Sequence, residues 1–270
     1  MIRATTVWKA PASLVRKARA RAEALGLPFE ERTKPLDQMG SGDGSFLIYG
    51  KKEPLLWHGG DIHTFHTGTA KLRLLAMKRG GEDRLCRLLP EGTASVLDCT
   101  FGEGKDSMVL SWYLGKEGQV TALEKSGALW EIGFYGLGHF EDPDPEMTEA
   151  LRRIRLVHAD FRTFLEEALP CSYDVIYFDT MFKRPVKREE NKRDAFRSGA
   201  CYDGLDEETL RLAMRAARRR VIVKERPFSP LFRLGLFQDV QYRRGQTTAY
   251  GVIDIPTALS PAAETAGKES

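Results

Sequence analysis

From residue 95 onward, short runs of apolar residues alternate with longer segments of helical or mixed character. Each run is almost continuously apolar, which is typical of strands that are covered on both faces. Strands of this kind, separated by helices, build a parallel, doubly wound sheet. The five runs are Ser95–Cys99, Gln119–Glu124, Ile154–His158, Tyr173–Phe178 and Arg220–Lys224.

The pattern changes towards the C-terminus. Two strand-like runs, residues 239–246 and 247–254, are separated by a glycine-containing turn with no helix between them. We therefore expect a hairpin that adds an antiparallel strand to an otherwise parallel sheet. The fold class predicted is α/β, with a doubly wound, mostly parallel sheet of seven strands. Residues 256–270, rich in Ala, Ser, Pro, Thr and Gly, predict a disordered tail.

Residues 1–65 differ in pattern and predict a small α+β unit. Ser13–Leu25 has helical apolar spacing, with Ser13 as the expected N-cap and Gly26 as the stop. Its many cations resemble those of a transit peptide, but a surface helix explains them better. Two strands, Ser45–Tyr49 and Pro54–Trp57, are expected to follow.

The chain is expected to divide into three parts. Residues 1–65 form the N-terminal unit, to which we assign a role in substrate binding, and residues 256–270 form the tail. Residues 66–255 form the main domain, whose first part, residues 66–92, is predicted to be helical.

Composition excludes some classes of protein. The 270 residues include 42% hydrophobic and 29% charged residues, and no apolar run is long enough to span a membrane. The net charge of +3 is too small to argue for nucleic acid by itself. Four cysteines without paired spacing argue against zinc and disulfides and favour a cytoplasmic protein. The sequence carries no signal for an oligomeric state.

The segment that follows the first strand of the main domain predicts a cofactor site. Gly102 and Gly104 allow a ligand to approach the backbone before a helix begins. Ser107 stands where a dinucleotide fingerprint has its third small residue, so NAD fits imperfectly but is not excluded. Asp98, at the strand end, would repel a pyrophosphate but suits the cationic amino-acid end of S-adenosylmethionine. Thr100, in the same turn, is assigned to this site.

Three further acids have both a binding and a structural interpretation. Glu124 ends the second strand, where an acid would accept both ribose hydroxyls of either cofactor. Asp160 could accept a hydrogen bond from an adenine amine, or could cap a helix. Asp106 could contact the cofactor, or could favour the helix N-terminus through the helix dipole.

The fourth strand of the main domain delivers a candidate catalytic group. Asp179 and the backbone carbonyl of Thr180 could accept the hydrogens of an exocyclic base amine, and Phe182 offers a face on which the base could stack. Such acceptors are needed because the amine lone pair is delocalised into the ring. The alternative is an ordinary strand-end acid followed by core residues.

Taken together, these motifs resemble class I S-adenosylmethionine-dependent methyltransferases. More narrowly, residues 95–254 are similar to the small-subunit ribosomal-RNA guanine-N2 methyltransferase family and its uncharacterised Gram-positive relatives. The resemblance implies cofactor contacts at Asp98, Gly102, Gly104, Glu124 and Asp160, and a substrate amine at Asp179. One departure is Thr180, where the family usually has proline, which would stiffen the turn.

Basic residues and histidines complete the candidate site. Lys183 and Arg184 begin a cation-rich segment that could grip RNA phosphates, or could be a solvated loop. Lys224 ends the fifth strand near the same crevice and is a candidate substrate contact. His66 is a further candidate. No carboxylate or thiol spacing joins it to His58 and His63, so no metal is predicted.

We therefore expect a methyltransferase that acts on an exocyclic amine of an RNA base, such as guanine N2 in ribosomal RNA. The expected partner is ribosomal RNA or the small ribosomal subunit. Two alternatives stay open on sequence grounds. One is an inactive RNA-binding or ribosome-assembly factor that retains the fold, and the other is an NAD-dependent oxidoreductase.

Overall fold

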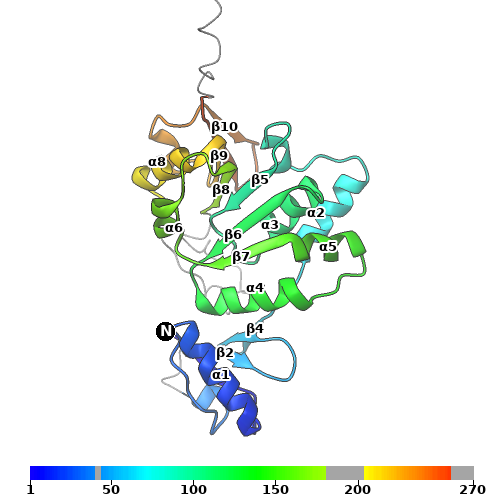
Figure 1. The fold of residues 1–270 in the computed structure, drawn as a ribbon, viewed down its shortest axis with the longest axis vertical. Coiled ribbons are helices and arrows are strands. Elements are labelled where there is room, and N and C mark those ends of the chain that lie inside the picture. The colour runs from blue at the N-terminus through cyan, green and yellow to red at the C-terminus, as the bar shows by residue number, and fades with distance from the viewer. Residues whose placement is uncertain (40–43, 181–203, 257–270) are drawn as a thin grey trace, which may run out of the picture.

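The protein folds into two sheets with helices around them. The structure is a computed structural model that describes residues 1–39, 44–180 and 204–256. A seven-stranded sheet forms the main body, and a four-stranded sheet belongs to a smaller N-terminal unit (Figure 1). The tail predicted for residues 256–270 falls outside the described residues except for its first position. No helix among the described residues is long and apolar enough to cross a membrane.

The large sheet has the order β10-β11-β9-β8-β5-β6-β7. Five neighbouring strands of this sheet, β9, β8, β5, β6 and β7, are parallel. Strand β11 runs antiparallel to both β9 and β10. The predicted doubly wound sheet with a C-terminal hairpin is therefore confirmed. The strands are β5 Ser95–Asp98, β6 Gln119–Glu124, β7 Ile154–His158, β8 Tyr173–Asp179, β9 Ala217–Glu225, β10 Asp239–Tyr242 and β11 Ala249–Asp254.

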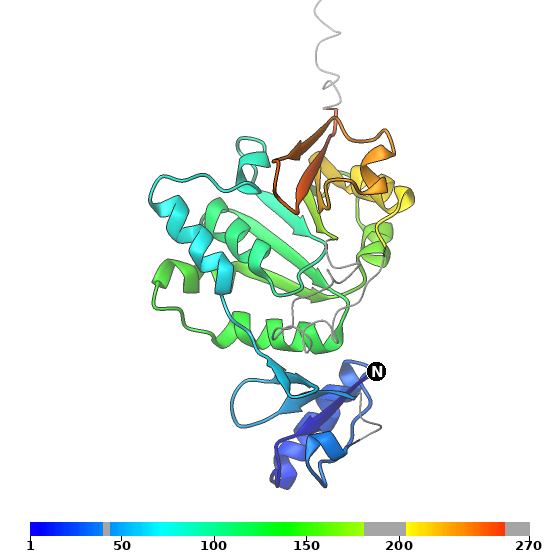
Figure 2. The same ribbon diagram turned by 180° about the vertical axis from the view of Figure 1, so that it is seen from behind.

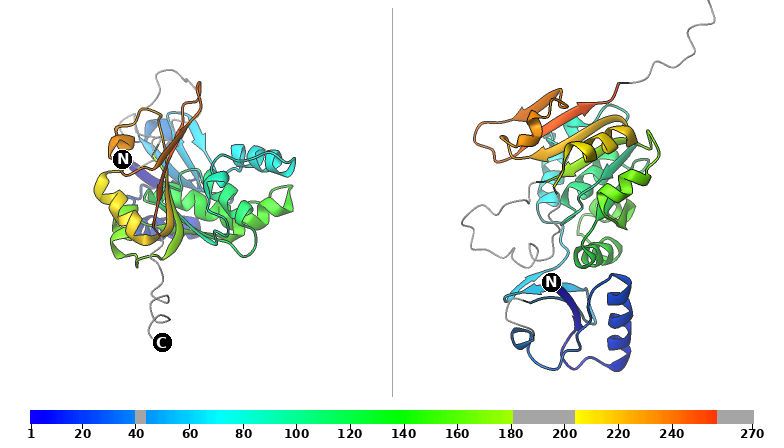
Figure 3. Two further views of the ribbon diagram at one scale, coloured as in Figure 1. Left: turned by 90° about the horizontal axis from the view of Figure 1, so that it is seen from above. Right: turned by 90° about the vertical axis from the view of Figure 1, so that its left-hand side faces the viewer.

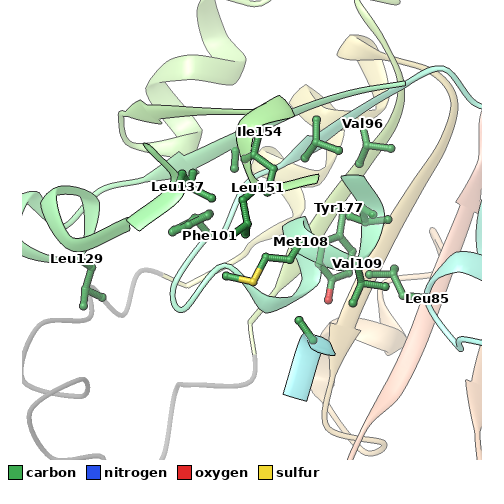
Figure 4. Close-up of a cluster of buried hydrophobic side chains, with 14 of the residues drawn as sticks. Leu85, Val96, Phe101, Met108, Val109, Leu129, Leu137, Leu151, Ile154 and Tyr177 are labelled. Atoms are coloured by element: carbon green, nitrogen blue, oxygen red, sulfur yellow. The ribbon is translucent and has the colours of Figure 1, made fainter. Parts of the chain in front are cut away.

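Helices cover both faces of this sheet, which explains why its central strands are apolar throughout. Successive side chains point to opposite faces. Val96 and Tyr177 accordingly join the core beneath α3 and α5 (Figure 4), whereas Leu97 and Ile176 join the core beneath α6 and α8. The helices are α2 Gly68–Lys78, α3 Lys105–Leu114, α4 Gly127–His139, α5 Pro145–Arg153, α6 Phe161–Glu167 and α8 Glu207–Ala216.

The N-terminal unit confirms the expected α+β composition. Its strands have the order β1-β2-β3-β4, in which β1 and β2 are parallel and the other pairs antiparallel. Helix α1 packs beside this sheet, as the side view shows (Figure 3). The elements are β1 Ile2–Thr6, α1 Ala12–Ala24, the 3-10 turn η1 Leu36–Gln38, β2 Ser45–Tyr49, β3 Leu55–His58 and β4 Asp61–His63.

Helix α4 connects the two parts of the molecule, because it lies between the large sheet and the N-terminal unit (Figures 1 and 2). Leu56 of β3 and Leu129 of α4 belong to one apolar cluster. A buried Glu131 on the same helix accepts a 2.8 Å hydrogen bond from Arg21 of α1. The unit thus shares its core with the main domain.

Some local predictions were wrong. Helix α1 begins at Ala12 after Pro11, and Ser13 lies inside it and does not cap it. The segment 82–89, predicted as helical, forms only the 3-10 turn η2 Cys86–Leu88. Asp83 explains this difference, because its carboxylate accepts the backbone N–H groups of Leu85 and Cys86, which competes with a regular helix.

We predict that the contact between α4 and the N-terminal unit depends on Gly136. A Cβ added there would overlap the ring of Phe65, whereas one added at Gly138 of the same helix meets nothing within 4 Å. Gly136→Ala should lower the free energy of unfolding by about 1–3 kcal/mol through overpacking. Gly138→Ala should leave it unchanged or raise it by up to about 1 kcal/mol. Urea denaturation measures both, and equal effects would contradict the predicted packing.

Candidate active site

The loop after β5 folds tightly because of its two glycines. Gly102 and Gly104 have φ angles of 55° and 73°, a region that side chains other than glycine rarely adopt. A Cβ at Gly104 would lie 2.5 Å from the ring of Phe101, so the loop also closes directly onto this buried side chain. The loop then enters α3, with Gly104 at the N-cap position.

Two buried acids flank this loop, one at the end of each neighbouring strand. The carboxylate of Asp98 accepts hydrogen bonds from the Thr100 N–H at 3.0 Å and from the Ser107 hydroxyl at 2.5 Å. The carboxylate of Glu124 accepts the N–H groups of Gly102 at 3.0 Å and Ser126 at 2.7 Å. The sequence-predicted cofactor residues 98, 100, 102, 104 and 124 are therefore brought together.

Neither acid has a cationic partner among the described residues. Burial is the main cause that raises the pKa of Asp98 to about 7 and the pKa of Glu124 to about 7. A buried carboxylate without a counter-charge is costly. These two side chains therefore form a site that a cation and hydroxyl donors would stabilise.

Thr100 connects this acidic site to the candidate catalytic residue. Its backbone N–H bonds to Asp98, and its hydroxyl oxygen accepts the backbone N–H of Asp179 at 2.7 Å. Asp179 lies at the end of β8, which pairs in parallel with β5. A cavity of about 180 Å³ opens here, lined by Thr100, Asp179 and Lys224 with other polar residues. Asp98 and Asp179 thus lie on the same edge of the sheet.

A network of charges forms the floor of the cavity. Lys224 donates to Asp106 at 2.9 Å and to Asp179 at 2.6 Å. Asp106 also accepts from Arg73 and, at 2.7 Å, from the hydroxyl of Tyr177. Burial alone would raise the pKa of Asp106, but Lys224 and Arg73 hold it well below its usual range. Both oxygens of Asp106 thus bond to protein groups, so Asp106 anchors Lys224 here.

Thr180 makes two bonds that its position between β8 and β9 requires. Its N–H donates to the carbonyl of Lys224 at 3.1 Å, and its hydroxyl donates to the buried Glu225 at 2.7 Å. A proline here could supply neither donor. In this chain the two hydrogen bonds hold Thr180 in place, whereas a proline would stiffen the turn through its ring.

The remaining predicted residues lie apart from the cavity or outside the described residues. Asp160 caps α6 by accepting the N–H groups of Arg162 and Thr163, and it pairs with Lys125 at 2.8 Å. It nevertheless lines a second, open cavity of about 470 Å³. His66 lies beside the glycine loop, 3.7 Å from Glu103. Phe182, Lys183 and Arg184 fall outside the described residues.

Sequence reasoning missed several residues of this site. Arg73 lies on α2, distant in sequence from both strands, and Tyr177 lies in the middle of an apolar strand where a core role is expected. Ser107 was weighed only as a small residue, although its hydroxyl bonds to Asp98. The sequence signal for a polar strand end was the pair of charged residues, Lys224 and Glu225, directly after an apolar run. The structure shows that Glu225 is buried.

Comparison with known proteins identifies the class to which this site belongs. Residues 62–233 match the family described as "Putative SAM-dependent methyltransferase", and the chain belongs to this family. Over 257 residues it is 29% identical to the uncharacterized protein YpiP of Bacillus subtilis, which covers 92% of this chain and 98% of YpiP.

Two curated relatives have a named substrate. They are called "Ribosomal RNA small subunit methyltransferase J" and come from Thioalkalivibrio sulfidiphilus and Alkalilimnicola ehrlichii. The first is 36% identical over 48% of this chain and 51% of its own length. The second is 32% identical over 57% of this chain and 59% of its own length.

A solved structure shows the same fold over almost the whole chain. The SAM-dependent methyltransferase NGO1261 of Neisseria gonorrhoeae is 19% identical, with a TM-score of 0.60. The match covers 96% of this chain and 98% of that one, so it includes the N-terminal unit. S-adenosylmethionine is therefore the cofactor that the family implies.

The residues present fit this cofactor. Asp98 is buried and has no counter-charge within residues 1–39, 44–180 and 204–256, which suits the ammonium group of the cofactor's amino-acid part. Glu124, equally buried at the end of the next strand, suits the two ribose hydroxyls. A pyrophosphate at the glycine loop would meet the Asp98 carboxylate, which argues against a dinucleotide.

We predict that cofactor affinity falls with pH below about 7. In the free protein Asp98 and Glu124 take up protons as the pH falls through about 7, whereas the cation favours an ionised Asp98. Each group that must ionise weakens binding by up to about tenfold per pH unit below its pKa. Isothermal titration of S-adenosylmethionine between about pH 5.5 and about pH 7.5 measures this. The Asp98→Asn variant should bind weakly with a shallower slope, and a flat wild-type profile would contradict the assignment.

We also predict that Thr180 and Glu225 act as a pair. Thr180→Val should destabilise the fold by about 1–3 kcal/mol, because the buried Glu225 carboxylate loses a donor. A Thr180→Val, Glu225→Gln double variant should show a coupling of at least about 0.5 kcal/mol in a double-mutant cycle. The contrary result is additivity of the two single changes in urea unfolding.

Proposed function

We propose that this protein methylates an exocyclic amine of an RNA base, with guanine N2 of ribosomal RNA as the target. The observation that carries the proposal is Asp179, a carboxylate that lies at a cavity edge directly beside the acidic cofactor site. A methyltransferase needs an acceptor at this point only when the nucleophile carries hydrogens, as an amine does.

The chemistry divides between the cofactor and the chain. When bound beside Asp98 and Glu124, S-adenosylmethionine would supply a methyl group on a positively charged sulfur, and this sulfur would leave as a neutral thioether when the amine nitrogen takes the methyl group. Asp179 and the backbone carbonyl of Thr180 accept the amine hydrogens, which directs the nitrogen lone pair away from them. The nitrogen must then lose one proton, and the Asp179 carboxylate is the group placed to take it.

Lys224 and Asp106 position this carboxylate. Lys224 holds Asp179 Oδ2 at 2.6 Å and is itself held by Asp106 at 2.9 Å. A preorganised carboxylate needs no rearrangement during the reaction, which is the main source of catalysis in polar sites. Lys224 therefore supports the proposal as a positioning residue.

The relatives support RNA as the substrate class. Two proteins called ribosomal RNA small subunit methyltransferases are similar to this chain over about half of their length. We extend their substrate, ribosomal RNA, to this chain as part of the proposal. The RNA would be bound either as naked ribosomal RNA or within the small ribosomal subunit. A substrate of this kind implies action in the cytoplasm.

We predict that Asp179→Ala lowers methyl transfer by about 10²–10³-fold. Its affinity for S-adenosylhomocysteine should change by no more than a few-fold, because Asp98 and Glu124 are untouched. Asp254→Ala is the matched control, since Asp254 pairs with Arg220 at 2.7 Å on another part of the sheet. An equal loss of transfer and of cofactor affinity would assign Asp179 a structural role.

The substrate itself is tested by nucleoside mass spectrometry of ribosomal RNA from cells with and without the gene. Loss of N2-methylguanine confirms the proposal, and loss of another methylated base corrects its target. Labelled-methyl transfer to RNA from cells that lack the gene adds a direct assay. No incorporation into any RNA fraction would favour the inactive, RNA-binding alternative.

A further inference from the structure

A cluster of three potential metal ligands lies at the glycine loop. His63 ends β4, His66 follows it in the connection to α2, and Glu103 lies between the two glycines of the loop. One nitrogen of each ring and one oxygen of the carboxylate all lie within 4.8 Å of one another. Two parts of the chain that are distant in sequence thus present three donors to one point.

The distances are close to those of a bound ion. His66 Nε2 lies 3.7 Å from Glu103 Oε1, and the two imidazole rings have their centroids 6.3 Å apart. Ligand atoms bound tetrahedrally at about 2.0–2.1 Å lie about 3.3 Å from one another. Side-chain movements of about 1 Å would therefore complete the coordination, without a change in the backbone.

The surroundings of the donors fit this role. Lys105 bonds to the other oxygen of Glu103, Oε2, at 2.5 Å, so the carboxylate is oriented with Oε1 towards His66. Ligating carboxylates are commonly held by a hydrogen bond of this type. Gly68 lacks the side chain whose Cβ would lie 2.7 Å from His66 Nδ1, which leaves room for the ring.

A small cavity lies among the donors. Its volume is about 10 Å³, and His63, His66 and Glu103 contribute to its lining. This is the size of a single water molecule or ion. His63 is buried, whereas the side chain of His66 is 47% exposed, so an ion could enter from the side of His66.

We propose that His63, His66 and Glu103 bind one divalent first-row transition metal ion. Two imidazoles and one carboxylate are a ligand set that zinc accepts, with a fourth position left for water. The ion would tie the end of the N-terminal sheet to the loop that carries the cofactor glycines. An ion pair between His66 and Glu103, with His63 as a neighbour, is the alternative that the experiment must exclude.

Direct binding to the unaltered protein is the first test. Chelator-treated full-length protein is titrated calorimetrically with Zn²⁺, and separately with Co²⁺ in a spectrophotometer. One equivalent of Zn²⁺ should bind, and Co²⁺ should give the visible absorption bands of a four- or five-coordinate ion. The absence of saturable binding overturns the proposal. This readout needs no methyl transfer, so it fails or succeeds independently of the proposed enzymatic function.

Variants then locate the site. His66→Ala and Glu103→Gln should each weaken Zn²⁺ binding by more than about 100-fold, since changes even to second-sphere groups cost 10–100-fold. His139→Ala is the control, because this exposed histidine lies on α4 and bonds to the carbonyl of Tyr135 in the same helix. Zn²⁺ should raise the melting temperature of the wild type and of His139→Ala but not of His66→Ala. Equal binding by all of these proteins would place the metal elsewhere and refute the assignment.

Discussion

The site depends on Lys224, which is partly buried between Asp106 and Asp179. An ammonium group removed from water needs charged partners, and a partner that is removed leaves a costly unpaired charge. The three residues belong to β9, α3 and β8, so this one interaction links two neighbouring strands to the first turn of the helix that follows the glycine loop. Asp179 and Lys224 are also directly paired in the parallel register of β8 and β9. The position of the Asp179 carboxylate is therefore fixed by both backbone pairing and charge.

The charges of the site separate into a balanced group and an unbalanced one. Asp106 and Asp179 are matched by Lys224 and Arg73, so this group would suit the neutral base that we propose as substrate. Asp98 and Glu124 have no cation among the described residues, and burial raises the pKa of each to about 7. The field they create favours a cationic ligand on the side of the glycine loop. Because Thr100 bonds to both Asp98 and Asp179, the two groups keep a fixed separation.

The large sheet, and the strand-end positions of the residues that we propose for the site, could be predicted from the sequence because both depend on local patterns. The strand ends at Asp98, Glu124 and Asp179 follow directly from continuous apolar runs. Strands β1 and β4 were missed, since neither is long or uniformly apolar. Arg73 and Glu103 could not have been assigned, because their partners come from other segments and only the folded chain brings them together. For the same reason His63 and His66 did not predict a metal site from the sequence, because Glu103 joins them only in the folded chain.

Helix α4 is the element against which both the N-terminal unit and the glycine loop pack. Other segments contact its glycines at close range. Leu25 approaches Gly127 through its carbonyl, the Phe101 ring fills the space beside Gly133, and the Phe65 ring lies against Gly136. Any larger residue would push these segments away from the helix. Phe101 belongs to the glycine loop, while Leu25 and Phe65 belong to the N-terminal unit, so both are positioned against the same rigid helix. The metal ion that we propose between His63 and Glu103 would add a second connection between the N-terminal unit and the glycine loop.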